Sequence, residues 1–376
     1  ADVNIAAGPR FQIADSASTF AVDIKALGCG GATLAAVNAG ADYCVEVRAL
    51  DSSGFGALAY GSTVTFAMQN IFDAPGSGPE IMDTDNTVDD VFGLPKQYKF
   101  IPADLGFKQF DVQLRLRRAS QFGASRRLVA TDLINATITG STDVVVNPMA
   151  GDRIMMMVQG EAYEPGKMTA PQGRGPSPTA RIAGNTTPVI ARVADQYWNT
   201  IFVSTTVTLV TSDPFDTNPG VQTFVGSTTI NVTLIQAGTQ TVTATGAGIE
   251  TNLANPSSEI PVASQLTPTQ LLALMPGETR VQGASPGKTG TVDPQVAGST
   301  FSVTVYGVDT FYNTVTSSVI LVSANIPSDT YAPAPGAQTL VSGATTFIMS
   351  AVIAATHTVQ AHAFAALASP DYVTPN

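Results

Sequence analysis

The 376-residue sequence has few charged residues. Lys, Arg, Asp and Glu make up 12% of it, where soluble proteins commonly have about 25%. The formal net charge is −11. Binding to phosphate backbones needs a basic surface, so nucleic acid is excluded as an expected partner. The low lysine content is typical of extracellular proteins. No apolar run approaches the ~20 residues that span a bilayer, so no membrane span is expected.

The residue types that carry common enzyme chemistry are also scarce. His357 and His362 are the only histidines, and neither has a neighbour at a metal-binding spacing. No serine stands in a nucleophile elbow, and no glycine-rich phosphate loop follows a strand and opens a helix. The sequence therefore predicts a protein that is not an enzyme and that needs no cofactor.

There are two cysteines, Cys29 and Cys44. An even number in a secreted chain indicates a disulfide. The glycines at positions 28, 30 and 31 permit the backbone to bend toward Cys44. The alternative is that both cysteines are small buried apolar residues.

What the sequence does contain is a repeat. Gly184 is followed eleven residues later by Asp195, and Gly298 is followed at the same distance by Asp309. Each Asp begins a turn that ends in an aromatic residue and Asn, at Asn199 and Asn313. A more divergent copy has Gly40 and then Asp51. A period of about a hundred residues predicts a small domain copied in tandem.

The local pattern within each copy is that of β-strands. Phe301, Val303 and Val305 alternate with polar residues, as expected of a strand buried on one side. The one helical candidate is 267–274, for which an extended linker is the alternative. Several short strands in about a hundred residues predict a two-sheet antiparallel sandwich. The predicted fold class is therefore all-β, with domains at 1–150, 151–262 and 263–376.

In these patterns the chain resembles the bacterial immunoglobulin-like repeats of large secreted and cell-surface proteins. The resemblance rests on the Ala-Gly strand start, the alternating strand, the Asp turn with its aromatic-Asn end, and the closing Ala237-Gly-Thr-Gln-Thr-Val-Thr-Ala244. It covers 39–148, 158–245 and 275–363. It implies stalks, adhesins, surface-layer and fibre proteins, or spacers of secreted enzymes. The first copy departs from it, since it lacks the aromatic-Asn turn and has an insertion near 73–97.

Two charged clusters are candidate binding sites. The acidic one contains Asp83, Asp85, Asp89 and Asp90, which suit calcium, although the spacing is not that of an EF-hand; a solvated loop is the alternative. The basic one contains Arg115, Arg117, Arg118, Arg126 and Arg127, which suit an anionic glycan or the acidic loop of another subunit. Its alternative is a charged outer face that protects an edge strand.

The Asp turns offer two further candidates. Trp198 and Tyr312 lie beside the turns, where an exposed aromatic ring can stack on a sugar. The alternative is packing over the end of its own sandwich or on the next domain. Asp195 and Asp309 are either metal ligands or residues that stabilise the turn through its backbone.

Together these features predict an extracellular structural protein, a rod of three sandwiches that builds a surface layer, sheath or filament. Its expected partners are further copies of itself. Strand addition by the N-terminal segment 2–26 is one way to join copies, with 20–26 as the donor strand. The alternative function is an adhesin or stalk that binds a surface glycan.

Overall fold

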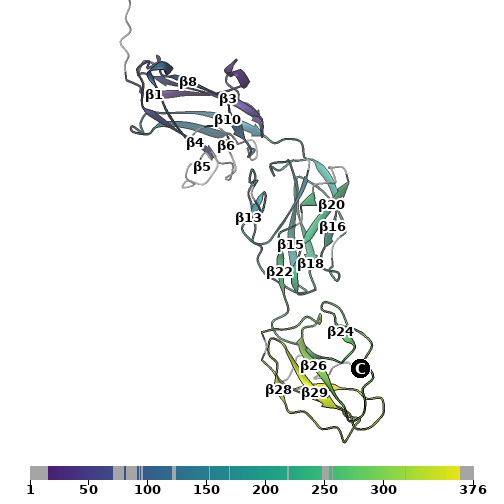
Figure 1. Cartoon of the computed structure of the whole chain (residues 1–376). Helices are drawn as coiled ribbons and strands as arrows, with labels where there is room; N and C mark the ends of the chain where they lie inside the picture. The colour runs from purple at the N-terminus through teal and green to yellow at the C-terminus, as the bar shows by residue number, and fades with distance from the viewer. Residues whose placement is uncertain are drawn as a thin grey trace, which may run out of the picture. The chain divides into compact units, whose positions relative to one another are not determined.

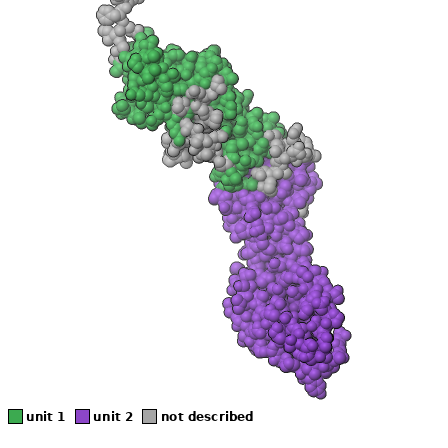
Figure 2. Space-filling model, in the orientation of Figure 1, with its two compact units in different colours: residues 1–153, 163–175, 193–203 green, residues 154–162, 176–192, 204–376 purple. Residues whose placement is uncertain are grey.

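The computed structural model describes residues 16–70, 80–81, 91–92, 94, 96–120, 124–151, 153–168, 170–217, 220–247, 254–255, 257–317 and 319–364. The chain forms two compact units (Figure 2). The first comprises residues 1–153, 163–175 and 193–203, and the second comprises 154–162, 176–192 and 204–376. The predicted calcium ligands Asp83, Asp85, Asp89 and Asp90 lie outside the described residues.

Nearly all regular structure is β, and the strand pairings fall into three sequence blocks (Figure 1). The first block contains β1 (Thr19–Lys25), η1 (Leu27–Cys29), β2 (Ala36–Asn38), β3 (Asp42–Leu50), β4 (Thr63–Asn70), β5 (Glu80–Ile81), β6 (Val91–Phe92), β7 (Gln97–Lys99), η2 (Pro102–Asp104), β8 (Phe107–Leu116), β9 (Arg126–Asp132) and β10 (Thr139–Asn147). One sheet has the order β1-β3-β8-β6, and the other has β2-β10-β9-β4-β5 with β7 beside β4.

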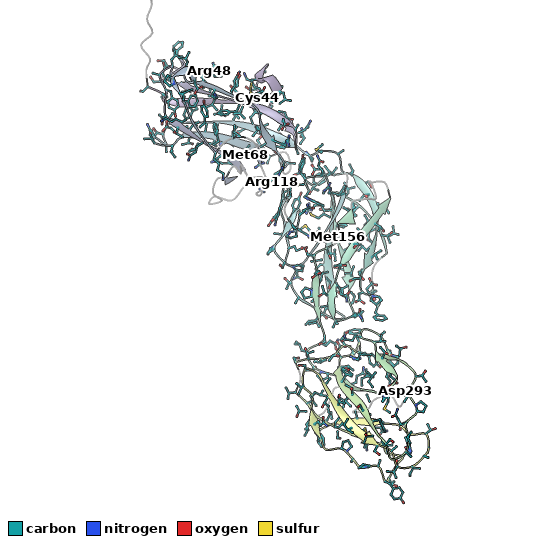
Figure 3. The ribbon with its side chains drawn as sticks, in the orientation of Figure 1. Cys44, Arg48, Met68, Arg118, Met156 and Asp293 are labelled. Atoms are coloured by element: carbon teal, nitrogen blue, oxygen red, sulfur yellow. A yellow bond between two sulfur atoms is a disulfide. The ribbon has the colours of Figure 1, made fainter. Side chains whose placement is uncertain are left out.

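These two sheets enclose one apolar core. Side chains of β3 and β8 lie in it with side chains of β4, β9 and β10. The rings of Phe66 on β4 and Phe110 on β8 meet edge to face, with centroids 5.4 Å apart. Met68 is fully buried between the layers (Figure 3). The first block is thus a sandwich.

The second block contains β11 (Arg153–Val158), β12 (Ala162–Tyr163), β13 (Arg174–Gly175), β14 (Arg181–Ile182), β15 (Thr186–Ala194), β16 (Ser204–Thr211), β17 (Val221–Val225), β18 (Ser227–Thr233), β19 (Gly238–Gln240), β20 (Val242–Ala247), β21 (Ala254–Asn255) and β22 (Ile260–Ala263). Its sheets are β18-β15-β11-β21, β14-β22-β19, β17-β16-β20 and the pair β12-β13.

The third block contains β23 (Gln270–Leu274), β24 (Glu278–Arg280), β25 (Lys288–Gly290), β26 (Thr300–Val308), β27 (Leu321–Asn325), β28 (Gln338–Thr339), β29 (Ala344–Ser350) and β30 (Gln360–Ala363). Its sheets are β23-β26-β29, β28-β27-β30 and the pair β24-β25. Phe301, Val303 and Val305 are buried as their alternation predicted, so the all-β sandwich fold is confirmed.

The structure differs from the sequence-based expectations at two places. Residues 267–274 form no helix, because residues 270–274 pair antiparallel with β26 as β23, which buries Leu271 and Leu272. The proposed donor strand 20–26 is not available to another copy. Residues 19–25 pair with β3 of their own sandwich, and Phe20, Val22 and Ile24 fill its core.

Candidate functional site

The turn 195–199, which connects β15 to β16, is organised by a buried carboxylate. Asp195 has no exposed surface. Its Oδ1 accepts the backbone N–H groups of Tyr197 at 2.8 Å and Asn199 at 2.9 Å. Its Oδ2 accepts the Met149 N–H and the Asn199 side-chain amide, both at 2.9 Å. Burial raises the pKa of the Asp195 carboxyl, against these hydrogen bonds, which lower it.

The side chain of Asn199 connects this turn by hydrogen bonds to the segment that follows β8. Within the first unit its Nδ2 donates to the Arg117 carbonyl at 2.7 Å, and its Oδ1 accepts the Ala119 N–H at 2.7 Å. A side-chain amide has one donor and one acceptor side, so it satisfies both backbone groups at once. Asn199 therefore binds the backbone of the first sandwich, whatever side chains that segment has.

The aromatic residue of the turn covers a glycine of the first sandwich. A Cβ built at Gly40 would overlap the ring of Tyr197, and Gly40 has φ of 75°. The Gly40 N–H donates to the Leu116 carbonyl at 2.7 Å, so this glycine turn lies beside the segment that Asn199 binds. Only glycine suits both the backbone conformation and the ring above it.

The second unit contains the same arrangement one block later. Asp309 accepts the N–H groups of Phe311 at 2.9 Å, Asn313 at 2.8 Å and Gln265 at 3.0 Å. Asn313 donates to the Ile235 carbonyl at 2.8 Å and accepts the Ala237 N–H at 2.8 Å. The Phe311 ring covers Gly184, whose φ is 82°.

We call residues 195–199 and 309–313 the clamp loops. We call the glycine turn and the backbone that each one binds its socket, at Gly40 with 117–119 and at Gly184 with 235–237.

The corresponding loop of the first block, 51–55, has the turn without the contacts. Asp51 accepts the N–H groups of Ser53 and Phe55, both at 2.9 Å. Serine replaces the aromatic residue there, and Phe55, at the position of the Asn, is 66% exposed.

The structure buries the proposed sugar-stacking tryptophan. Trp198 is 3% exposed and has φ of 66°, and the Arg153 guanidinium lies 4.6 Å from its ring centroid. Trp198 is therefore not the exposed ring that sugar stacking requires. Tyr312 has φ of 62° and is half-buried, and Arg280 donates to its carbonyl at 2.6 Å. Burial lowers the pKa of Arg280.

The five arginines do not share one free face. Arg115 pairs with Asp42 at 2.8 Å, and Arg127 pairs with Asp143 at 2.7 Å. Arg126 is 1% exposed, and its Nη1 lies 3.3 Å from the Arg118 carbonyl that it donates to. The carbonyl of Arg117 is bound by Asn199. The guanidinium groups of Arg115, Arg126 and Arg127 thus make contacts within the first unit.

Cys29 and Cys44 form a disulfide, with their Cα atoms 5.2 Å apart. Their sulfur atoms and Asp111 are the only cluster of three metal-ligand types found in the described part of the chain. Because the two sulfurs are bonded to each other, this cluster offers no thiolate to a metal. No helix among the described residues is both long and apolar enough to cross a membrane.

No family model and no curated protein matches the chain. Solved structures similar to it include invasin, a bacterial integrin-binding protein, at 12% identity over 94% of this chain and 59% of invasin, with a TM-score of 0.30. InvD of Yersinia pseudotuberculosis is 12% identical over 93% of this chain and 95% of InvD, with a TM-score of 0.26. A family 2 glycosyl hydrolase of Bacteroides cellulosilyticus is 8% identical over 63% of this chain, with a TM-score of 0.22. The matched part spans 28% of that hydrolase.

Proposed function

We propose that the protein is a non-enzymatic structural protein of the cell surface, in which immunoglobulin-like sandwiches are joined in series. The observation that carries this proposal is the clamp loop, which recurs with the same hydrogen bonds in both units. A joint that is repeated along the chain serves a stalk or the building block of a surface layer, sheath or filament. Weak charge supports dense packing of copies, because it limits their repulsion.

The glycan-binding alternative has less support. It depended on the five arginines and on Trp198 and Tyr312. Arg115 and Arg127 are paired with carboxylates, and Arg126 and Trp198 are buried within the first unit. Tyr312 is half-buried. The clamp loops also bind backbone atoms and glycine turns, which is a way to join sandwiches and not a way to select a sugar.

Two glycine substitutions test whether the clamp stiffens the joint. Gly184→Ala and Gly298→Ala place a Cβ at nearly the same positive φ, 82° and 79°, at a cost of about 1–2 kcal/mol each. Only the Cβ at position 184 meets a ring, that of Phe311, whereas nothing lies within 4 Å at position 298. Gly184→Ala is therefore expected to lower the stability of the folded joint by about 1–3 kcal/mol more than Gly298→Ala does, because the Phe311 ring must shift.

The measurement is a distance distribution between spin labels at Thr208 and Ser302, which are both exposed and lie in the second unit. The wild type and Gly298→Ala should give one narrow distribution, and Gly184→Ala a broad one. A broad distribution in the wild type, or an equally narrow one in Gly184→Ala, would contradict a stiff clamped joint.

A further inference from the structure

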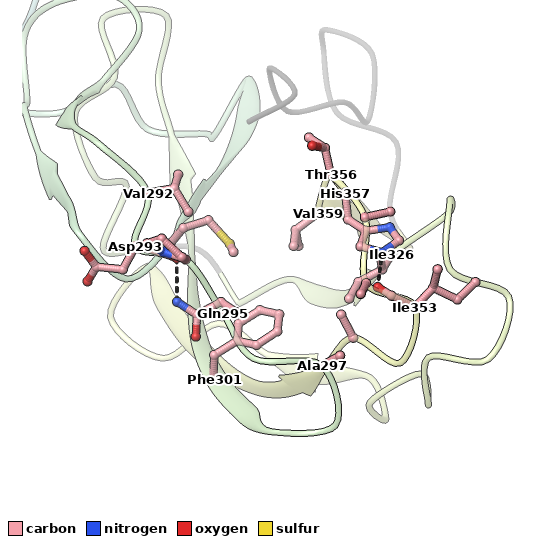
Figure 4. A pocket seen from close by; sticks show the side chains of 15 residues that line it. Val292, Asp293, Gln295, Ala297, Phe301, Ile326, Ile353, Thr356, His357 and Val359 are labelled. Atoms are coloured by element: carbon pink, nitrogen blue, oxygen red, sulfur yellow. Dashed lines mark hydrogen bonds between the residues drawn. The ribbon is translucent and has the colours of Figure 1, made fainter.

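The third sandwich has an open groove at the end that contains Gly298. The groove has a volume of about 500 Å³ (Figure 4). Residues 292–295 and Ala297 line one side, residues 353–357 line the other, and Phe301, Ile326 and Val359 give it an apolar lining. Val296, which precedes Ala297 in the sequence, is 71% exposed.

In the second block a strand fills the corresponding place. β22 lies between β14, with Arg181 opposite Val262, and β19, with Gly238 opposite Val262. Its Ile260 and Val262 are 0% and 4% exposed. The Ala183 N–H donates to the Ala263 carbonyl at 2.8 Å. β22 is thus the strand that closes this sandwich.

The first block is closed in the same way. The end of β10 runs parallel to β2, with Val146 opposite Val37, and buries Val144 and Val146. The Ala39 N–H donates to the Asn147 carbonyl at 2.8 Å, which is the counterpart of the bond from Ala183.

The described residues provide no such strand to the third block. Equivalent hydrogen bonds show which residues of the third and second blocks correspond. The Gly298 N–H donates to the Ala351 carbonyl at 2.7 Å, and the Gly184 N–H donates to the Leu234 carbonyl at 2.8 Å. Ala297 thus corresponds to Ala39 and Ala183, which are 1% and 0% exposed. Ala297 is exposed, and within the described residues its N–H makes no hydrogen bond.

The socket at this end is open too. The Val352 carbonyl and the Ala354 N–H correspond to the groups of Ile235 and Ala237 that Asn313 binds. Neither group has a hydrogen-bond partner in the described part of the chain. Among the residues that the structure describes, neither a closing strand nor a clamp loop contacts this end of the third block, whereas the other blocks have both.

We propose that residues 2–6 of a second copy of this chain fill the groove as the closing strand. The N-terminal stretch Asp2-Val-Asn-Ile-Ala6 has the pattern of the two strands that close the other blocks, Asp143-Val-Val-Val-Asn147 and Glu259-Ile-Pro-Val-Ala263. Each has an acidic residue, then two β-branched residues separated by one position. Val3 and Ile5 take the places of Ile260 and Val262, facing inward.

This proposal rests on the proposed structural function and names how copies join. An added strand gains main-chain hydrogen bonds along both neighbours, and alternate side chains enter the core. Since the N-terminal stretch of one copy would enter the groove of the next copy, addition generates a head-to-tail polymer.

Matched substitutions in the donor stretch test the proposal. Ile5→Asp places a charge on the inward face, and Asn4→Asp adds the same charge one position away, on the outward face. Sedimentation and electron microscopy of the full chain should show polymers for the wild type and Asn4→Asp. Ile5→Asp should raise the concentration needed for assembly more than tenfold, while its melting curve stays like that of Asn4→Asp.

A cross-link tests the register. Ala6 corresponds to Ala263, which lies opposite Ile182, the counterpart of Val296. The double variant Ala6→Cys with Val296→Cys should give a covalent ladder on a non-reducing denaturing gel, and either single variant should give dimers at most. A cross-link confined to one chain, a wild type that stays monomeric, or an Ile5→Asp variant that assembles normally would each overturn the proposal. Normal assembly of Ile5→Asp together with a softened joint in Gly184→Ala would reject the donor strand alone and leave the structural function standing.

Discussion

Replacing Asp309 by alanine is expected to lower the free energy of unfolding of the third sandwich by about 4 kcal/mol, because the change leaves buried donors without an acceptor. The carboxylate has no exposed surface and accepts three backbone N–H groups as well as the side-chain amide of Asn313, at 3.2 Å. Each unsatisfied buried donor costs about 1–3 kcal/mol, and such costs add only in part.

Asp51→Ala is the matched control. It removes the same turn-forming residue from the first block, where the carboxylate accepts two N–H groups and is partly exposed. We expect a loss of about 1 kcal/mol for this change. Hydrogen exchange measures both, because the free energy of opening is obtained separately for β26 and for β3. Equal losses at the two sites would show that the clamp adds nothing to an ordinary Asp turn.

Much of the fold follows from patterns of period two. β26 alternates buried and exposed residues along Phe301, Val303 and Val305, because one face of the strand lies on the core. Residues 267–274 do not follow this period-two pattern. Leu271 and Leu272 are good helix formers, but both neighbours of Leu272 are buried too, and pairing with β26 decides the structure. The local helix propensity of these residues gives no information about their pairing with β26.

The sequence predicts the turns of the clamp loops but not the contacts that their side chains make. The aromatic-Asn turn is present at 195–199 and 309–313 and absent at 51–55. From the sequence alone, this difference indicates only that the first repeat has diverged. Its physical cause is contact, since the two complete loops each cover a glycine turn of the preceding block. An aromatic residue beside a turn is compatible with an exposed tip and with a buried anchor. The burial of Trp198 depends on neighbours such as Arg153, and the turn pattern does not specify them.

The disulfide provides the second large effect. Replacing both Cys29 and Cys44 by alanine is expected to destabilise the first sandwich by about 3 kcal/mol, the chain-entropy value for closing a loop of about 15 residues. The bridge holds η1 against β3, where Cys44 lies opposite Lys25 of β1. Cys44 is fully buried and Cys29 is 8% exposed, so alanine leaves no buried polar group behind.

The two units make this experiment internally controlled. Hydrogen exchange should show β1 and β3 opening more readily in the double variant, while β26, in the second unit, keeps its wild-type protection. Reduced wild-type protein should match the double variant, because both lose the same cross-link. If β1 and β3 exchange as slowly without the bridge as with it, the first sandwich does not depend on the bridge, and the packing of its aromatic core is sufficient to hold η1 in place.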